Sequence, residues 1–237
     1  MSITYVALDL ETTGLDPKRD HILEIGAARI VDGEVRDSYA VFVNSGVKIP
    51  EFITDLTGID NAMAASGVSP RAAVKGLLDF CEDYAILGHN VLFDYSFLKR
   101  GAVNQGLTFE NPGIDTLKIA RKFLSELPSR SLGALCHYYG ISQVRSHRAF
   151  DDAIAASRLY DCMKNEFLGA SPAAFEPKPL IYQVKKEGPI TKLQKLYLND
   201  LKKYHKIELD VIVDSLTKNE ASRMIDKIIL NYGKIKR

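Results

Sequence analysis

Two acidic side chains lie close together in the middle of an apolar strand near the start of the chain. Asp9 and Glu11 are two residues apart, and side chains along a strand alternate between its faces, so both carboxylates point to the same face. The apolar residues that alternate with them point to the opposite face, toward a core: Val6, Leu8 and Leu10. Two neighbouring carboxylates that lose hydration repel each other unless a cation lies between them. The segment therefore predicts either a metal site or a strand with an exposed acidic face.

Two further acids stand near the starts of predicted helices. Asp94 falls in about the first turn of one helix, and Asp152 falls in the first turn of another, with His147 in the loop before it. Taken alone, each acid is equally consistent with a carboxylate that interacts with a helix dipole. Asp151 competes with Asp152 for the same role. We interpret Asp151 as a solvated acid at the helix start and Arg148 as a surface residue.

Together these residues follow the order Asp-x-Glu, Asp and His-x4-Asp, each where a strand ends or a helix begins. That order resembles the DEDDh family of 3′–5′ exonucleases, which are ribonuclease H-like. The motifs are similar to those of the proofreading (epsilon) exonuclease modules of bacterial DNA polymerase III. Residues 9–15, 89–98 and 147–153 resemble the three motifs of the family, and residues 56–59 resemble a further family segment. The resemblance covers about residues 1–168.

The resemblance implies a site for two divalent cations, Mg²⁺ or Mn²⁺. Two such ions stabilise the attacking and the leaving oxygen of a phosphodiester, and carboxylates supply the hard oxygen ligands that both metals prefer. By resemblance, Asp9 bridges both ions, Glu11 and Asp152 hold the ion on the nucleophile side, and Asp94 supports the second ion. His147 is the implied general base, since an imidazole can take a proton from water near neutral pH.

The resemblance also implies residues that contact a nucleic acid. The backbone at Thr12, Thr13 and Gly14 is expected to meet the terminal 3′-hydroxyl. Leu15 is expected to wedge beside the terminal base, and Asn90 to approach a phosphate. The alternative is a plain glycine turn after the strand and an asparagine that caps the next helix.

The expected elements place the acids at the ends of strands and the starts of helices. Strands are predicted over 3–10, 22–31 and 34–43, and the Asp32-Gly33 pair predicts a hairpin between the last two. A further strand is predicted over 85–88, and helices over 70–84, 92–104, 116–124, 131–139 and 149–166. An antiparallel three-stranded meander followed by alternating strands and helices predicts a mixed α/β sheet flanked by helices. By resemblance, the fold is ribonuclease H-like.

The C-terminal region has a different character. Four prolines fall within 169–189, which predicts a linker or a strap over the first domain, and helices are predicted over 190–204 and 217–232. This small basic helical region, 190–237, with the residues just before it, combines lysines with tyrosines: Lys185, Lys186, Lys192, Lys195, Lys202, Lys203, Lys206, Tyr182, Tyr197 and Tyr204. It is either an accessory domain that holds nucleic acid by phosphate contacts and stacking, or a helical bundle with a solvated lysine face.

The distribution of charge is uneven along the chain, and the cysteine content indicates a reducing compartment. The 237 residues carry a net charge of +1, yet residues 176–237 carry +6 and the first 175 residues carry −5. The odd number of widely spaced cysteines, Cys81, Cys136 and Cys162, predicts free thiols in a reducing compartment. No apolar run approaches a membrane span and no signal peptide pattern opens the chain, so we expect a cytoplasmic protein without a membrane partner.

We therefore expect a 3′–5′ exonuclease that acts on nucleic acid, above all DNA single strands or frayed 3′ ends, and releases nucleoside 5′-monophosphates in proofreading or repair. A DNA polymerase is a partner that the resemblance allows. One alternative is an exoribonuclease of the same fold that trims RNA 3′ ends, since the metal chemistry is indifferent to the sugar. A further alternative is a subunit that binds or tethers nucleic acid without turnover.

Overall fold

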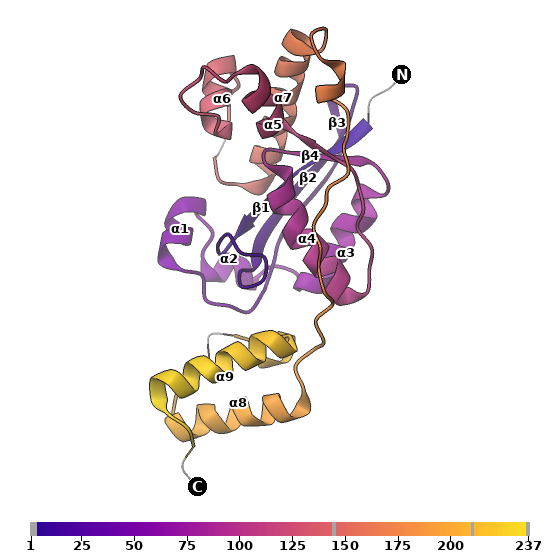
Figure 1. The fold of residues 1–237 in the computed structure, drawn as a ribbon. Coiled ribbons are helices and arrows are strands. Elements are labelled where there is room, and N and C mark those ends of the chain that lie inside the picture. Colours follow the sequence, from indigo (N-terminus) through magenta and orange to yellow (C-terminus); the bar gives the residue numbers. More distant parts are fainter. Residues whose placement is uncertain (1–3, 144–145, 210, 236–237) are drawn as a thin grey trace.

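The computed structural model describes residues 4–143, 146–209 and 211–235 and contains a five-stranded mixed sheet (Figure 1). The strand order is β3-β2-β1-β4-β5. The first three strands form an antiparallel meander, and β4 and β5 add to it in parallel. The strands are β1 (Thr4–Thr12), β2 (Ile22–Val31), β3 (Glu34–Phe42), β4 (Ala85–Gly88) and β5 (Gly113–Asp115). This arrangement confirms the predicted mixed sheet with an antiparallel three-stranded meander.

Helices cover both faces of the sheet. Val6, Leu8 and Leu10 of β1 pack in one cluster with α3 and α4, whereas Tyr5 and Ala7 pack on the other face with α5, α6 and α7. The helices of the first 168 residues are α1 (Glu51–Thr57), α2 (Asn61–Ala65), α3 (Pro70–Cys81), α4 (Val91–Gln105), α5 (Thr116–Phe123), α6 (Leu132–Tyr139) and α7 (Ala149–Phe167). The alternation predicted for β1 therefore holds, and it assigns the two acids of this strand to the face that α7 covers.

The first turn of α7 lies unusually close to the sheet. A Cβ atom built on Gly26 of β2 would lie 2.1 Å from the amide nitrogen of Phe150 and 2.3 Å from the carbonyl carbon of Ala149. Gly26 is the register partner of Asp9 on β1. The missing side chain therefore lets the start of α7 approach the sheet next to the first catalytic candidate.

Two α-helices and one β-strand lie outside the set predicted from sequence. These are the short helices α1 and α2 after the meander and the three-residue strand β5. Several predicted boundaries also differ. For example, β1 continues to Thr12, and α3 ends at Cys81, where Glu82 has a positive φ of 48°. Short elements carry too few residues for a periodic pattern, which is why sequence reasoning misses them.

The chain after α7 runs back across the sheet before it forms a second small core. Phe175, just after the short 3-10 helix η1 (Pro172–Ala174), is buried in the core beneath α7, and Lys178 forms a bridge with Gly113 of β5. Part of the segment 169–189 therefore packs against the sheet, and we term this segment the strap. It leads to a C-terminal unit (190–235) in which α8 (Lys192–His205), η2 (Val213–Ser215) and α9 (Lys218–Tyr232) surround a separate apolar cluster (Figure 1).

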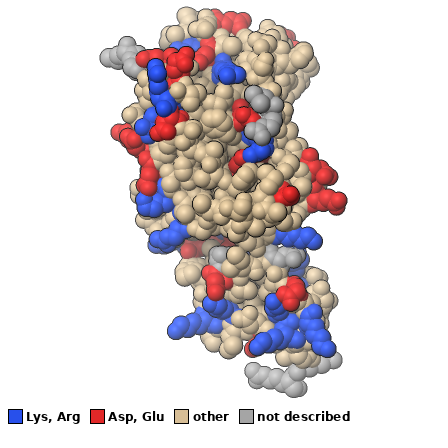
Figure 2. Space-filling view, turned by 180° about the vertical axis from the view of Figure 1, so that it is seen from behind, with Lys and Arg blue, Asp and Glu red and all other residues tan. Residues whose placement is uncertain are grey.

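Positive charge gathers on the C-terminal unit. The face in Figure 2 shows Lys and Arg on both the C-terminal part and the upper body, with most of the Asp and Glu side chains around the upper body. Within the predicted lysine cluster, Lys195 pairs with Asp214 and Lys202 pairs with Glu208.

The three cysteines are free thiols. Within the described ranges, none of the helices combines the length and the apolar character of a membrane span.

The close approach at Gly26 leads to a stability prediction. Gly26→Ala should lower the free energy of unfolding by about 1–3 kcal/mol, because the added methyl group must push α7 away from β2. Gly169→Ala is the matched control, since nothing lies within 4 Å of a Cβ there. Urea titration of both variants measures the difference. Equal stability of the two variants would contradict the close contact.

Candidate active site

The acids of β1 meet an acid of α4 at the end of the strand. Asp94 lies in the first turn of α4 and is 2% exposed. Its Oδ1 accepts a hydrogen bond of 3.1 Å from the amide of Leu10, the residue between Asp9 and Glu11. The structure therefore brings the carboxylates of the first two sequence motifs close enough to repel one another.

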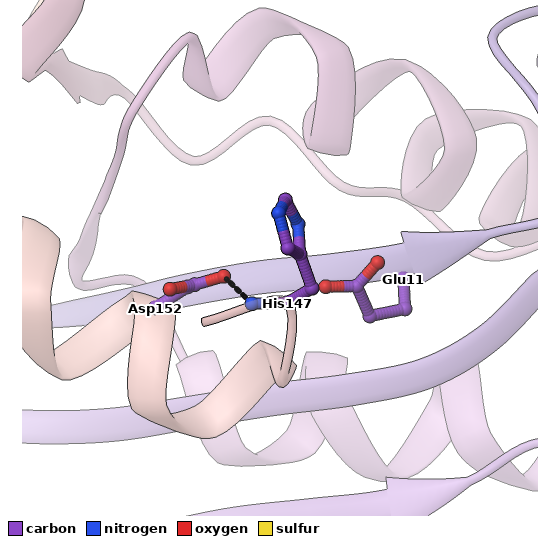
Figure 3. A group of neighbouring side chains, drawn as sticks. All are labelled: Glu11, His147 and Asp152. Carbon is purple, nitrogen blue, oxygen red and sulfur yellow. Dashed lines mark hydrogen bonds between the residues drawn. The ribbon is translucent and has the colours of Figure 1, made fainter. Parts of the chain in front are cut away.

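The third motif joins them from the start of α7. Asp152 lies in the first turn of this helix, and its Oδ2 accepts a 2.9 Å hydrogen bond from the backbone amide of His147. Its Oδ1 accepts a 3.1 Å hydrogen bond from the side chain of Gln143. Potential ligand atoms of Glu11, His147 and Asp152 all lie within 4.8 Å of one another (Figure 3). His147 is exposed and its backbone is left-handed, with φ 60°, so the loop presents its ring at the edge of the acid cluster.

Burial and mutual repulsion raise the pKa values of the four carboxylates in this cluster. Burial raises the pKa of Asp9 well above its usual value, and repulsion from Asp94 and Glu11 raises it further. The pKa of Glu11 rises from 4.5 to about 7, through burial and then repulsion from Asp152. Burial likewise raises the pKa values of Asp94 and Asp152. Repulsion of this kind disappears when a cation neutralises the carboxylates.

This set of donors fits hard divalent cations. Four carboxylates from three elements, β1, α4 and α7, offer oxygen ligands at one place, and each of them repels at least one other. Oxygen-rich sites of this type suit Mg²⁺ or Mn²⁺ rather than thiophilic metals. Asp94 already uses one oxygen to accept the Leu10 amide, which leaves its second oxygen for a ligand role.

The loop after β1, which we term the β1–β2 loop (residues 13–21), closes on itself around Asp20. The amide of Thr13 donates to the carbonyl of His21 at 2.9 Å, and the amide of His21 donates to the hydroxyl of Thr13 at 3.0 Å. A Cβ on Gly14 would lie 2.5 Å from the Asp20 carboxylate, so this position excludes a side chain. Leu15 is 83% exposed beside it. The loop therefore holds Gly14 in a tight turn and leaves Leu15 able to contact a ligand.

Asn90 lies at the junction of β4 and α4. Its φ is 70°, and although it occupies the position before α4, its side chain makes no capping hydrogen bond. Its backbone amide donates to Asp115 at 3.1 Å. The neighbouring His89 is held by Thr116 and by the carbonyl of Arg130, and burial lowers its pKa. The exposed Asn90 side chain is thus compatible with the predicted phosphate contact, and the capping alternative is wrong.

The interpretation of Arg148 as a surface residue is wrong. Its guanidinium forms a two-pronged ion pair with the buried Glu24 of β2, at 2.8 and 3.1 Å, and lies 5.3 Å from the centre of the Phe42 ring. The same carboxylate accepts the Ala149 amide at 3.1 Å, at the start of α7. Glu24 and Arg148 therefore fix the backbone directly after His147. The sequence signal for Glu24 is a charged residue in the apolar run of β2.

Comparison with known proteins places this site in a family. The family described as Exonuclease (RNase_T) matches residues 6–160. The chain belongs to this exonuclease family. The chain is 32% identical over 158 residues to the DNA polymerase III subunit epsilon of Aquifex aeolicus, covering 66% of this chain and 78% of that subunit. It is also 37% identical over 155 residues to the PolC-type DNA polymerase III of Clostridium perfringens, covering 65% of this chain and only 11% of that polymerase.

Solved exonuclease structures share the fold. A zinc-bound complex of Escherichia coli exonuclease I with single-stranded DNA aligns with a TM-score of 0.64 at 20% identity, covering 73% of this chain and 42% of that chain. Exonuclease X in complex with 5′ overhanging duplex DNA aligns with a TM-score of 0.55 at 20% identity. The alignment covers 68% of this chain and 92% of that chain. The exonuclease family match ends before the C-terminal unit, which begins at residue 190.

The raised pKa of Glu11 predicts how stability depends on pH without metal. The folded state holds the proton of Glu11 up to about pH 7, so metal-free protein should lose stability as pH rises from 4.5 through 7. Glu11→Gln removes this loss and should be about 1–2 kcal/mol more stable than wild type at pH 8 in EDTA, with little difference at pH 5. Thermal unfolding of wild type and Glu11→Gln at pH 5 and pH 8 measures these differences. A variant less stable than wild type at pH 8 would contradict the electrostatic account.

Proposed function

We propose that this chain is a metal-dependent 3′–5′ exonuclease that hydrolyses DNA from single-stranded or frayed 3′ ends and releases nucleoside 5′-monophosphates. The observation that carries the proposal is the meeting of Glu11, Asp152 and His147 beside Asp9 and Asp94 in a chain of the exonuclease family. Relatives named as DNA polymerase III epsilon and PolC support DNA as the substrate, as does the single-stranded DNA bound to exonuclease I.

We assign four carboxylates to binding two divalent cations, Mg²⁺ or Mn²⁺. Asp9, Glu11, Asp94 and Asp152 would hold these ions through their carboxylate oxygens. When bound, the cations supply the positive charge that stabilises the attacking and the leaving oxygen. The hydrogen bonds from Gln143 and the His147 amide hold the Asp152 carboxylate in place, and the Leu10 amide does the same for Asp94.

His147 is assigned to proton transfer. Its imidazole takes a proton from the water that attacks phosphorus, the bond to the 3′-oxygen breaks, and the shortened strand keeps that oxygen. The Glu24–Arg148 ion pair on its C-terminal side and the Asp152 carboxylate hold the backbone that carries the ring. The orientation of the His147 ring, the proposed general base, therefore depends on residues that do not touch the substrate.

The β1–β2 loop is assigned to the terminal nucleotide. The backbone of Thr12, Thr13 and Gly14 faces the 3′-hydroxyl, Leu15 contacts the terminal base, and Asn90 contacts a phosphate. The exposed side chains of Leu15 and Asn90 and the compact loop around Asp20 support this assignment.

We further propose a cytoplasmic protein that cooperates with a DNA polymerase, with an exonuclease domain at 1–168, a strap at 169–189 and an accessory domain at 190–237. The free cysteines suit a reducing compartment. The polymerase names of the relatives support the partner, although the chain spans only 11% of the C. perfringens polymerase.

Product analysis tests the proposal. DNA and RNA oligonucleotides of one sequence, labelled at the 5′ end, are incubated with the protein with and without Mg²⁺. We expect a ladder of shortened labelled DNA and nucleoside 5′-monophosphates only with Mg²⁺, and more than about 100-fold loss in Asp9→Ala. Faster degradation of RNA would favour the RNA-trimming alternative. An Asp9→Ala variant as active as wild type would overturn the mechanism.

A second variant tests the proton-transfer role of His147. His147→Ala should lower kcat by about 10²–10⁴-fold, because the attacking water loses its general base. Divalent cation binding, followed by calorimetry, should change little, since the four carboxylates remain. Loss of metal binding in this variant would show that His147 is a ligand instead.

A further inference from the structure

The C-terminal unit touches the β1–β2 loop directly. Arg223 of α9 donates a 2.9 Å hydrogen bond from Nη2 to the carbonyl oxygen of Lys18, which lies near the tip of the loop. These residues are 205 positions apart in the chain. The contact joins a part of the molecule outside the family match to the segment that carries Gly14 and Leu15.

A second contact lies at the end of the loop and contains buried charges. Arg100 of α4 lies between Glu187 of the strap, at 3.3 Å, and Glu220 of α9, at 3.6 Å. The side chains are only 11%, 15% and 14% exposed. The hydroxyl of Thr217 at the start of α9 also donates to Glu187, at 2.8 Å. Removing one partner of an ion pair with so little exposure is strongly destabilising, because the other charge stays buried without a counter-charge.

The same charges surround His21, the last residue of the loop. A cavity of about 570 Å³ is lined by Asp20, His21, Arg100, Glu187 and Glu220, together with other residues of α4, the strap and the C-terminal unit. Asp20 is also the residue around which the loop closes, through its bonds to the Asp16 amide at 2.8 Å and the Thr13 hydroxyl at 3.5 Å. The C-terminal unit thus meets the loop at its tip and at its base.

We propose that the C-terminal unit is part of the apparatus that binds the 3′ end, with Arg223 and the Arg100–Glu220 pair as positioning residues for the β1–β2 loop. The inference rests on the proposed function, which assigns this loop to the terminal nucleotide. The exonuclease domain supplies the loop, and the C-terminal unit holds it in the conformation that presents Gly14 and Leu15. The unit therefore acts on substrate binding through the loop and not on the chemical step.

The test removes both contacts while it keeps the helix start intact. The double variant Glu220→Gln/Arg223→Gln loses the ion pair to Arg100 and the bond to Lys18, but Gln can still accept the Thr217 amide that Glu220 now accepts at 2.7 Å. The matched control, Asp226→Asn/Lys227→Gln, removes one negative and one positive charge from the exposed surface of the same unit. Arg223→Ala alone is a milder variant at an exposed position.

Three measurements separate the outcomes. In the double variant, hydrogen exchange of a peptide covering 13–21 should accelerate about tenfold, and KM for single-stranded DNA should rise about 3–10-fold with kcat within about twofold. The control should match wild type, and Arg223→Ala should show a smaller change in the same direction. Unchanged exchange would overturn the contact, and faster exchange with unchanged KM would overturn its role in binding. Faster exchange in a protein whose wild type cleaves no DNA would leave the contact intact and reject the proposed function.

Discussion

The close contact between α7 and β2 at Gly26 is the constraint on which the site depends. Asp152 and His147 belong to the third motif, whereas Asp9 and Glu11 belong to the first, and about 140 residues separate them. They meet because a residue without a side chain lets the first turn of α7 lie against the strand beside Asp9. Glu24 adds a second link at the same point, since it accepts the Ala149 amide and pairs with Arg148.

Packing at this point has an electrostatic consequence. The helix start brings Asp152 close to Glu11, and burial then raises the pKa of every carboxylate in the cluster. Hydrophobic packing on both faces of the sheet must offset this repulsion in the absence of metal. The fold thus holds the acids in a geometry in which either protonation or a bound cation relieves the repulsion.

Sequence reasoning finds the acids but not all of the residues that hold them. Strand alternation correctly assigns Asp9 and Glu11 to one face, and helix start signals correctly place Asp94 and Asp152 in first turns. Arg148 and Glu24 are 124 residues apart, so no local pattern connects them. The contact between Arg223 and Lys18 is equally invisible in the sequence, and α1, α2 and β5 are too short to show a period. The roles of the site residues remain predictions.

The strap also covers one edge of the sheet, where the backbone of β5 could otherwise pair with a strand of another molecule. The backbone of Lys178 bonds to that of Gly113 at 2.8 and 2.9 Å, and this covers the edge that β5 would otherwise expose. At the opposite edge, β3 presents the charged, exposed residues Glu34, Arg36 and Asp37. Unprotected strand edges recruit other strands and cause aggregation, and charged side chains oppose this. One edge is thus protected by covering it and the other by charge, so loss of the strap would expose a new site for aggregation.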